Sequence, residues 1–202
     1  MKVEAYAELA DVILSLPPKL GRTRLVAVDG PSGAGKTVFA ERLARAVTTI
    51  DGEETPVVHT DDLLDGWSDQ LTFWPRLGTA VLAPLSKGEP GRYRRYDWLA
   101  GDFGDSWVTV SPSPVVLLDG VSTARAEVRP KLTLSVFVTA PPALRLQRAL
   151  DRDSSAITPY LDNWRTGEDR HFAADRTAEH ADLVVDGGSD LPHDEETHYI
   201  RH

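Results

Sequence analysis

Short apolar runs recur along the chain, and segments with helical spacing of apolar residues separate most of them. The runs are Leu25–Val28, Pro56–His59, Val115–Leu118, Leu134–Val138 and Leu183–Val185. None alternates regularly between apolar and polar positions, which is typical of strands covered on both faces in a parallel sheet. The alternation of such strands with helices predicts an α/β fold in three layers, with the sheet between helices.

Helical periodicity is clear at two places near the amino terminus. Residues 3–16 carry apolar and acidic residues at helical spacing and stop at Pro17-Pro18, so they predict a helix within the segment 1–20. After the first apolar run, three apolar side chains fall on one side of a second predicted helix, which should be its core face. These residues are Phe39, Leu43 and Val47.

Residues 66–113 interrupt the strand–helix rhythm. They contain four of the five tryptophans and a predicted hairpin from Gly91 to Val110. An insertion on an α/β core is a natural place for substrate contacts, because loops on a rigid scaffold often carry function. The alternative is a hydrophobic cap that only packs against the core.

Composition limits the classes of function. The chain has 202 residues, 41% hydrophobic and 26% charged, which suits a single domain with a substantial core. A net charge of −9 argues against a nucleic-acid partner, and the lack of cysteine excludes disulfides and thiolate chemistry. No segment reaches the roughly 18 apolar residues of a membrane span, so we expect a cytoplasmic protein without a membrane partner. Residues 187–202 form a polar tail with three of the six histidines, to which we assign no role.

One contiguous segment carries the strongest chemical signal. Residues 30–37, Gly-Pro-Ser-Gly-Ala-Gly-Lys-Thr, follow the first apolar run and fit G-x-x-x-x-G-K-[ST], the Walker A phosphate loop. Glycines let backbone N–H groups wrap a polyphosphate, and the following helix adds its positive end. We expect ATP to be bound by Gly30, Ser32, Gly33, Ala34, Gly35, Lys36, Thr37 and Val38. Lys36 should neutralise the β- and γ-phosphates, and the Thr37 hydroxyl should hold Mg²⁺.

The third apolar run ends in Asp119-Gly120 and resembles a Walker B strand. Such a strand delivers a carboxylate to the Mg²⁺ ion beside the phosphate loop, so Asp119 is the second predicted metal residue. The next residue is Gly120, where motor-type ATPases place a glutamate that activates water. This difference argues against a dedicated hydrolase, and the lack of an Asn-Lys-x-Asp segment argues against a GTPase.

Two carboxylates, Asp61 and Asp62, follow the second apolar run. Strand ends in this fold class point toward the ligand cleft, and phosphorylation of a hydroxyl needs a carboxylate to accept its proton. We favour Asp61 as this base, although either aspartate could serve. The other, Asp62, would then cap the next helix or contribute to the Mg²⁺ or substrate site.

Arginines gather in a predicted helix that opens with Pro141-Pro142. Helical spacing places Ala143, Leu146 and Leu150 on a core side and Arg145, Arg148 and Arg152 opposite. The arginine stripe suits a lid, residues 145–165, that stabilises the transferring phosphate through Arg148 and Arg152. The alternative is a solvated basic face.

Residues 93–98, Tyr-Arg-Arg-Tyr-Asp-Trp, combine aromatic rings, guanidinium groups and a carboxylate. Such groups stack on and hydrogen-bond a small planar or polyhydroxylated molecule. Together with Asp62, the predicted substrate contacts are Arg95, Tyr96 and Asp97. A packed hairpin with a surface ion pair is the alternative.

Taken in order, these motifs resemble the uridine kinase/phosphoribulokinase-like branch of P-loop kinases, especially uridine-kinase-like proteins of high-GC bacteria. The matching pieces are residues 30–37, Thr-Asp-Asp-Leu-Leu at 60–64, Tyr-Asp-Trp at 96–98, Leu-Leu-Asp-Gly at 117–120 and Arg-Leu-x-Arg at 145–148. The resemblance covers about residues 24–186. It implies a P-loop NTPase fold with a five-stranded parallel sheet in the order 2-3-1-4-5, a helical lid, ATP and Mg²⁺. It also places the catalytic aspartate at Asp61 and nucleoside contacts at Tyr96 and Asp97.

Two departures from the family pattern bear on the substrate. The family usually has Glu-Gly where this chain has Asp119-Gly120, and residues 98–110 lack the histidine that reads the pyrimidine in uridine kinases. These differences put uridine and cytidine in doubt as substrates. The motifs as a whole still predict an ATP-dependent phosphotransferase that acts on a hydroxyl of a nucleoside or similar metabolite. A vitamin, sugar or antibiotic hydroxyl as acceptor, and an ATP-binding regulatory protein without turnover, remain alternatives. Whether the chain forms a homodimer also stays open.

Overall fold

The computed structural model of the chain describes residues 1–153 and 158–202, apart from the side chains of residues 152, 153, 158 and 159. The strands are β1 (Lys2–Ala5), β2 (Arg24–Asp29), β3 (Val57–His59), β4 (Gly91–Asp97), β5 (Asp102–Val110), β6 (Val115–Asp119), β7 (Leu132–Thr139), β8 (Leu183–Asp186) and β9 (His198–Arg201). The helices are α1 (Tyr6–Ser15), α2 (Lys36–Asp51), α3 (Trp74–Leu77), α4 (Ala83–Ser86), α5 (Pro142–Asp153), α6 (Thr158–Asp175) and α7 (Thr177–His180). Short 3₁₀ turns are η1 (Thr60–Leu63), η2 (Trp67–Asp69) and η4 (Arg129–Lys131), and a π-helical turn, η3 (Gly78–Leu82), joins α3 to α4.

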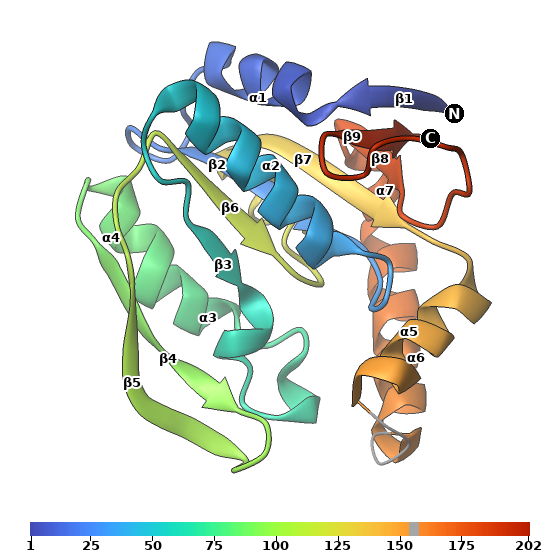
Figure 1. Cartoon of the computed structure of the whole chain (residues 1–202). Helices are drawn as coiled ribbons and strands as arrows, with labels where there is room; N and C mark the ends of the chain where they lie inside the picture. Colours follow the sequence, from blue (N-terminus) through green and yellow to red (C-terminus); the bar gives the residue numbers. More distant parts are fainter. Residues whose placement is uncertain (154–157) are drawn as a thin grey trace.

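A seven-stranded sheet in the order β1-β9-β8-β7-β2-β6-β3 forms the centre of the molecule (Figure 1). Strands β3, β6, β2, β7 and β8 are parallel to one another. Numbered along the chain, these five follow the order 2-3-1-4-5, which is the order that the resemblance implies. Each corresponds to one of the five apolar runs, with ends that differ by one or two residues.

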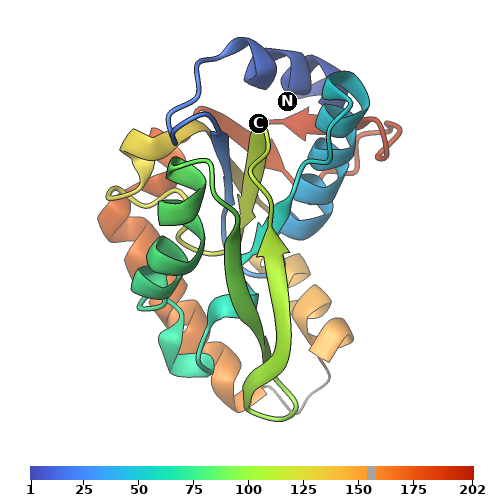
Figure 2. The same cartoon turned by 90° about the vertical axis from the view of Figure 1, so that its left-hand side faces the viewer.

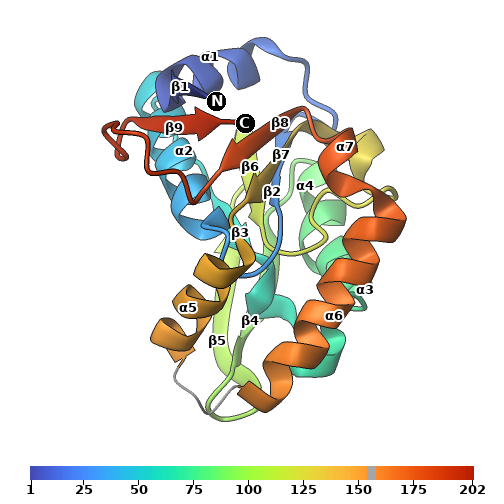
Figure 3. The same cartoon turned by 90° about the vertical axis from the view of Figure 1, so that its right-hand side faces the viewer.

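Helices cover both faces of this sheet (Figures 1 and 3). Because side chains alternate along a strand, β2 sends Val26 and Val28 to one face and Leu25 and Ala27 to the other. The first pair packs with residues of α1 and α2, including Phe39, Leu43 and Val47. The second pair packs with residues of α3, η3, α4 and α6. The predicted three-layer α/β fold and the core face of α2 are confirmed.

The chain termini differ from the prediction. Residues 3–5 belong to strand β1, and the helix begins only at Tyr6. The polar tail contains strand β9, which pairs antiparallel with β1 over four residues and also contacts β8. Tyr199 and Ile200 of β9 are buried, and the Tyr199 ring packs against Tyr6 and Phe39 at centroid distances of 5.3 and 5.4 Å. Burial of this aromatic cluster explains why a mostly polar segment forms a strand.

The insertion contains the predicted hairpin, formed by β4 and β5 (Figure 2). Its start lies directly on the helical segment before it, since a Cβ atom at Gly91 would lie 2.8 Å from the Cα of Val81. Tyr93 and Val110 of the hairpin are buried in the same cluster as Leu77, Val81 and Leu85. The insertion is therefore packed onto the face of the sheet opposite α2.

Helix α5 is oriented differently from the prediction. Ala143 and Leu146, two of the three predicted core residues, are exposed, with Leu146 36% accessible. Ala149 is buried instead, and Leu144 lies within 3.1 Å of the Cβ position of Gly188. The helix packs across backbone loops rather than on the apolar sheet, so helical periodicity did not identify its inner face.

No helix in the described part of the chain combines the length and the apolar character needed to cross a membrane.

Candidate active site

The loop Gly30–Thr37 connects β2 to α2 and is held close to neighbouring backbone. Gly33 has φ +76°, and a Cβ atom there would lie 2.4 Å from the carbonyl oxygen of Arg145. Both the left-handed backbone and the close approach require glycine at this position. The Lys36 ammonium folds back and donates a hydrogen bond to the carbonyl of Pro31 at 3.1 Å. The loop is thus a tight turn at the carboxyl end of the central strand.

The amino terminus of α2 is suited to an anion. The first hydrogen bond of the helix runs from the Phe39 N–H to the carbonyl of Gly35 at 3.1 Å, so the N–H groups of residues 36–38 precede it. The N-cap residue is Gly35, and no side chain caps the helix. Unsatisfied N–H groups and the helix dipole together favour a phosphate at this point.

Asp119 lies beside the start of this helix. Its Oδ2 atom accepts hydrogen bonds from the Thr37 hydroxyl at 2.8 Å and from Nδ1 of His59 at 2.9 Å. The hydrogen bond to Asp119 raises the pKa of His59 above its usual value, against the opposing effect of burial. Asp119 is only 4% exposed, and its Oδ1 atom is buried without a hydrogen-bond partner in the described residues. An orphaned carboxylate oxygen next to a threonine hydroxyl is the donor set expected for Mg²⁺ beside a phosphate loop.

The structure therefore brings together the two predicted metal residues, Thr37 and Asp119. His59 is hydrogen-bonded to the same oxygen of Asp119. No group of three or more acidic, histidine or cysteine side chains in the described ranges could hold a metal by itself. In proteins, Mg²⁺ is commonly held by one or two protein groups together with phosphates and water.

Gly120, directly after Asp119, lies against the segment that carries the candidate base. Its φ is +150°, and a Cβ atom there would lie 1.8 Å from the hydroxyl oxygen of Thr60. The same hydroxyl donates to the carbonyl of Asp119 at 3.2 Å. The ends of β6 and β3 are thus in direct contact.

Asp61 and Asp62 both lie in the turn η1, directly after β3. Asp61 is exposed, and Asp62 is half-buried. The Asp62 carboxylate accepts a hydrogen bond from Nε of Arg95 at 2.9 Å and a weaker one from the Tyr93 hydroxyl at 3.4 Å. Two of the predicted substrate residues, Asp62 of η1 and Arg95 of β4, therefore form an ion pair that connects η1 to the hairpin.

The other two predicted substrate residues have structural contacts within the hairpin. The Tyr96 ring is buried and packs edge-on against Trp98 and Phe103, each at a centroid distance of 5.2 Å. The Oδ1 atom of Asp97 accepts hydrogen bonds from the N–H groups of Leu99 and Ala100 at 2.9 and 3.0 Å. Asp97 thus stabilises the hairpin turn.

One of the two predicted arginines, Arg148, lies at the phosphate loop. A single nitrogen of Arg148 donates to the carbonyls of Gly33 and Gly187, at 3.2 and 3.0 Å. Arg148 therefore connects the phosphate loop to the loop after β8. The backbone of Arg152 belongs to α5, but its side chain lies outside the described residues, as do residues 154–157 of the predicted lid.

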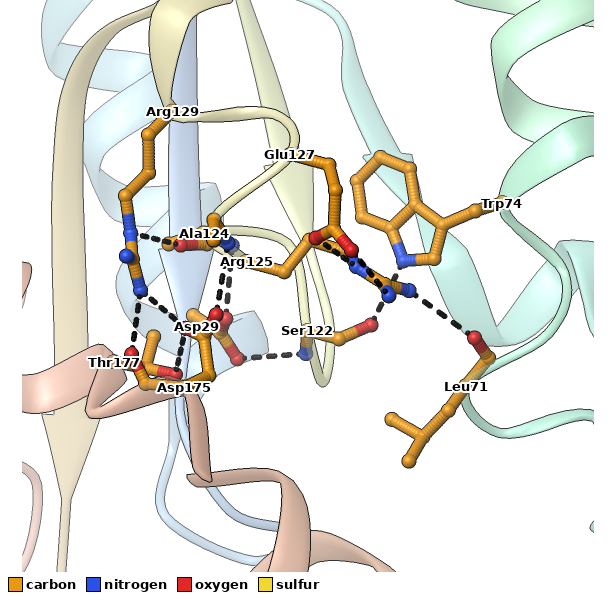
Figure 4. Close-up of polar contacts among 11 residues, drawn as sticks. Asp29, Leu71, Trp74, Ser122, Ala124, Arg125, Glu127, Arg129, Asp175 and Thr177 are labelled. Atoms are coloured by element: carbon orange, nitrogen blue, oxygen red, sulfur yellow. Dashed lines mark hydrogen bonds and ion pairs between the residues drawn. The ribbon is translucent and has the colours of Figure 1, made fainter. Parts of the chain in front are cut away.

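A buried carboxylate that the motif analysis missed lies directly before the phosphate loop. Asp29 is fully buried and accepts hydrogen bonds from the N–H groups of Gly30, Ser122 and Ala124 at 2.7, 2.9 and 2.8 Å (Figure 4). Burial raises the pKa of Asp29 to about 6, against the opposing effect of these hydrogen bonds. The signal was present in the sequence, because Asp29-Gly30 follows the first apolar run just as Asp119-Gly120 follows the third.

The loop that Asp29 holds also contacts the insertion and α6 (Figure 4). The Ser122 hydroxyl accepts a hydrogen bond from the Trp74 indole at 3.0 Å. Arg129 forms an ion pair with Asp175 at the end of α6. The loop after β6 thus joins the phosphate loop to both the insertion and α6.

Helix α6 supplies further residues that the sequence did not reveal. Trp164 and Glu168 lie one helical turn apart, are both buried, and contact Ser32 of the phosphate loop. The Trp67 ring stacks on Tyr160 at a centroid distance of 5.1 Å and meets Trp164 edge-on at 5.5 Å. A cavity of about 530 Å³ lies between α6 and the segment after η1. It is lined by Trp67, Ser68, Gln70, Leu71, Thr72, Tyr160, Asn163 and Trp164.

Known proteins of similar sequence match only part of this chain, and no family model matches it. Inorganic pyrophosphatase TTM2 of Arabidopsis thaliana is 31% identical over 138 residues, which cover 64% of this chain. Inorganic pyrophosphatase TTM1 of the same plant is 29% identical over a stretch of the same length. The chain spans about one fifth, 20%, of the length of each of these relatives.

Solved structures match nearly the whole chain. A possible uridine kinase from Bacillus stearothermophilus is similar with a TM-score of 0.66 and 21% identity, over 89% of this chain and 96% of that one. A candidate fructose transport system kinase from Silicibacter sp. TM1040 is similar with a TM-score of 0.69 and 20% identity, over 90% and 98% of the two chains. The chain therefore has the three-layer α/β fold of P-loop kinases, with its phosphate loop, β3 end and β6 end at one edge of the sheet.

Proposed function

We propose that this chain is an ATP-dependent kinase that transfers the γ-phosphate of ATP to a hydroxyl group of a nucleoside or a similar small metabolite. One observation carries the proposal. The uncapped start of α2, the Thr37 hydroxyl and the buried Asp119 carboxylate with its orphaned oxygen lie together at the phosphate loop. This set of groups suits a nucleoside triphosphate with its divalent cation.

On the nucleotide side, the N–H groups of the loop and of residues 36–38 would bind the phosphates. Lys36 would exchange its hydrogen bond to Pro31 for the β- and γ-phosphate oxygens. Thr37 and Asp119 would hold Mg²⁺, which neutralises negative charge on these phosphates when bound. Arg148, already at the carbonyl of Gly33, would add positive charge next to the transferring group, and we assign Arg152 the same role.

On the acceptor side, Asp61 would orient the acceptor hydroxyl and accept its proton. The acceptor oxygen forms a bond to the γ-phosphorus, and the bond from that phosphorus to the bridging β–γ oxygen breaks. ADP leaves with the electron pair of the broken bond, and the proton of the hydroxyl moves to the Asp61 carboxylate. The ion pair of Asp62 with Arg95 supports the acceptor-side role that we assign to Asp62.

The cavity next to α6 supports an acceptor with a planar ring. Its volume of about 530 Å³ lies within the usual range for small-molecule sites. The rings of Trp67 and Trp164 can pack on such a ligand, and the amides of Gln70 and Asn163 can hydrogen-bond its edge. Trp164 also donates a hydrogen bond to Ser32 of the phosphate loop at 2.9 Å, so a ligand in this cavity would lie close to that loop.

A second candidate function is hydrolysis of a phosphoanhydride without an organic acceptor. The observation that favours it is the 31% identity to part of a plant inorganic pyrophosphatase. Against it stands Gly120, since the residue after Asp119 cannot activate water.

A coupled ADP-release assay with ATP and Mg²⁺ over nucleosides, vitamins and sugars tests the proposal. We expect at least one ring-bearing acceptor to raise ADP release well above the basal rate, and Asp61→Asn to abolish the increase. Phosphate release from pyrophosphate in a parallel assay would favour the hydrolase. ATP binding without acceptor-dependent turnover in the whole panel would contradict the kinase proposal and favour a regulatory nucleotide-binding protein.

A further inference from the structure

Glu168 is a fully buried carboxylate that the proposed chemistry does not use. It lies in α6 with 0% exposure. Its Oε1 atom accepts a hydrogen bond from the Ser32 N–H at 2.9 Å, another from the Ser32 hydroxyl, and a third from Nε1 of Trp164 at 2.9 Å. Its Oε2 atom is buried without a partner among the described residues. Since an isolated buried carboxylate is strongly unfavourable, these donors must compensate for its burial.

Both hydrogen-bond donors of Ser32 are directed to this carboxylate. The Ser32 hydroxyl additionally accepts from the Trp164 indole at 2.9 Å, so the three groups form a closed triangle. With its N–H and O–H engaged, Ser32 does not present a donor to the centre of the loop. The Ala34 N–H donates to the carbonyl of Pro31 at 3.2 Å, so the donors left for a phosphate lie chiefly at the start of α2.

The position of α6 relative to the loop is fixed by a second contact. Gln70 donates from Nε2 to the carbonyl of Trp164 at 3.2 Å. A Cβ atom at Gly167 would lie 2.5 Å from the Oε1 atom of Gln70. Glycine within a helix costs about 1 kcal/mol relative to alanine, and here it permits this close approach. The buried face of α6 is therefore locked to the segment after η1 while Glu168 reaches the phosphate loop.

We propose that Glu168 is a positioning residue for nucleotide binding, which acts by holding Ser32. The carboxylate fixes the first half of the phosphate loop in the turn that leads to the N–H groups of residues 36–38, which would bind the anion. Trp164 and Gly167 keep Glu168 in place. The inference rests on the proposed function in one respect, namely that this loop binds ATP.

The test is the dissociation constant of ATP with Mg²⁺, measured by titration calorimetry well below the unfolding temperature of each variant. We expect Glu168→Gln to weaken ATP binding about tenfold, because the neutral amide oxygen would accept these hydrogen bonds less strongly than the carboxylate oxygen does. Its NH₂ group would also occupy the buried position of Oε2, which has no partner among the described residues. Asp169→Asn is the matched control: it removes a carboxylate from the next residue of α6, which is exposed, and should change the constant less than twofold. Ser32→Ala should weaken binding less when added to Glu168→Gln than when added to the wild type.

An ATP affinity of Glu168→Gln within twofold of the wild type, even with a lowered unfolding temperature, would overturn the proposal and leave Glu168 a structural residue. Fully additive effects of the two substitutions would also overturn it. Should Glu168→Gln fail to fold, Trp164→Phe decides, with an expected loss of about threefold and no loss as the contradicting result. A wild-type chain that does not bind ATP would instead refute the proposed function, and no Glu168 variant can mimic that result.

Discussion

The nucleotide side and the acceptor side of the proposed site are built in different ways. The nucleotide side is one contiguous loop whose shape depends on backbone contacts, such as Gly33 against the carbonyl of Arg145. The acceptor side is assembled from side chains of separate segments, such as Arg95 with Asp62 and Trp67 with Tyr160. A backbone-built site tolerates almost no change at its tightest points, whereas a site built from side chains can change specificity by substitution.

The largest effect should come from Asp61, which in our proposal acts where the acceptor meets the γ-phosphate. We expect Asp61→Asn to lower kcat by about 10³-fold without changing ATP affinity, because removal of a general base typically costs 10²- to 10⁴-fold. Steady-state kinetics with the best acceptor, together with ATP titration, measure both quantities. Asp65→Asn, an exposed aspartate close by, is the control and should stay near wild-type activity. Retention of more than a tenth of kcat in Asp61→Asn would remove Asp61 as the base.

Asp29, directly before the phosphate loop, should make the free energy of unfolding of the chain depend on pH. Burial raises its pKa from 3.8 to about 6, so between these values the folded state keeps a proton that the unfolded state has released. Its contribution to the free energy of unfolding is therefore largest below pH 4 and falls by about 3 kcal/mol as pH rises through 6. Urea unfolding of the wild type and of Asp29→Asn from pH 4 to 7 measures this as the difference between the two curves. A difference that is flat or rises with pH would contradict the prediction.

Substitution of Gly33 tests whether the loop is determined by its backbone. We expect Gly33→Ala to weaken ATP binding about 100-fold, since its Cβ would lie 2.4 Å from a backbone carbonyl oxygen. Gly88→Ala is the matched control, because Gly88 has nearly the same φ, +75°, but no atom within 4 Å of its Cβ position. It should lose only stability, of the order of 1 kcal/mol. Equal effects of both variants on ATP affinity would contradict a tightly packed loop.

The acceptor side should respond more weakly and more selectively. We expect Arg95→Gln to raise the KM of the acceptor about tenfold with an unchanged KM of ATP, because it frees Asp62 from its ion pair. Arg94→Gln, at the neighbouring exposed position, should leave both constants unchanged. A parallel rise of the KM of ATP in Arg95→Gln would show that the two sides are not separable.

The same contrast explains what could be predicted from the sequence. The five parallel strands, the helix after the phosphate loop and the hairpin were predicted, because each depends on a local pattern. The pairing of Thr37 with Asp119 could also be expected, since adjacent parallel strands end at the same edge. These features need only short segments and the general rules of the fold.

Features that depend on distant side chains were missed. The inner face of α5 was predicted wrongly because it contacts backbone carbonyls through arginines, and apolar periodicity carries no information on such contacts. Strand β1 was predicted as helix because its partner β9 lies at the other end of the chain. Glu168 and Trp164 could not be assigned to the phosphate loop, because their contact with Ser32 spans more than 130 residues.

The glycine at position 120 limits how the proposed site could change in evolution. Any larger residue there would collide with Thr60 and push aside the turn that presents Asp61. A mutation that installed a glutamate after Asp119 would therefore disturb the turn that carries Asp61, the base in our proposal. In the proposed kinase, hydrolysis of ATP without an acceptor would thus be disfavoured by this steric conflict, and not only by the lack of a suitable acid at this position.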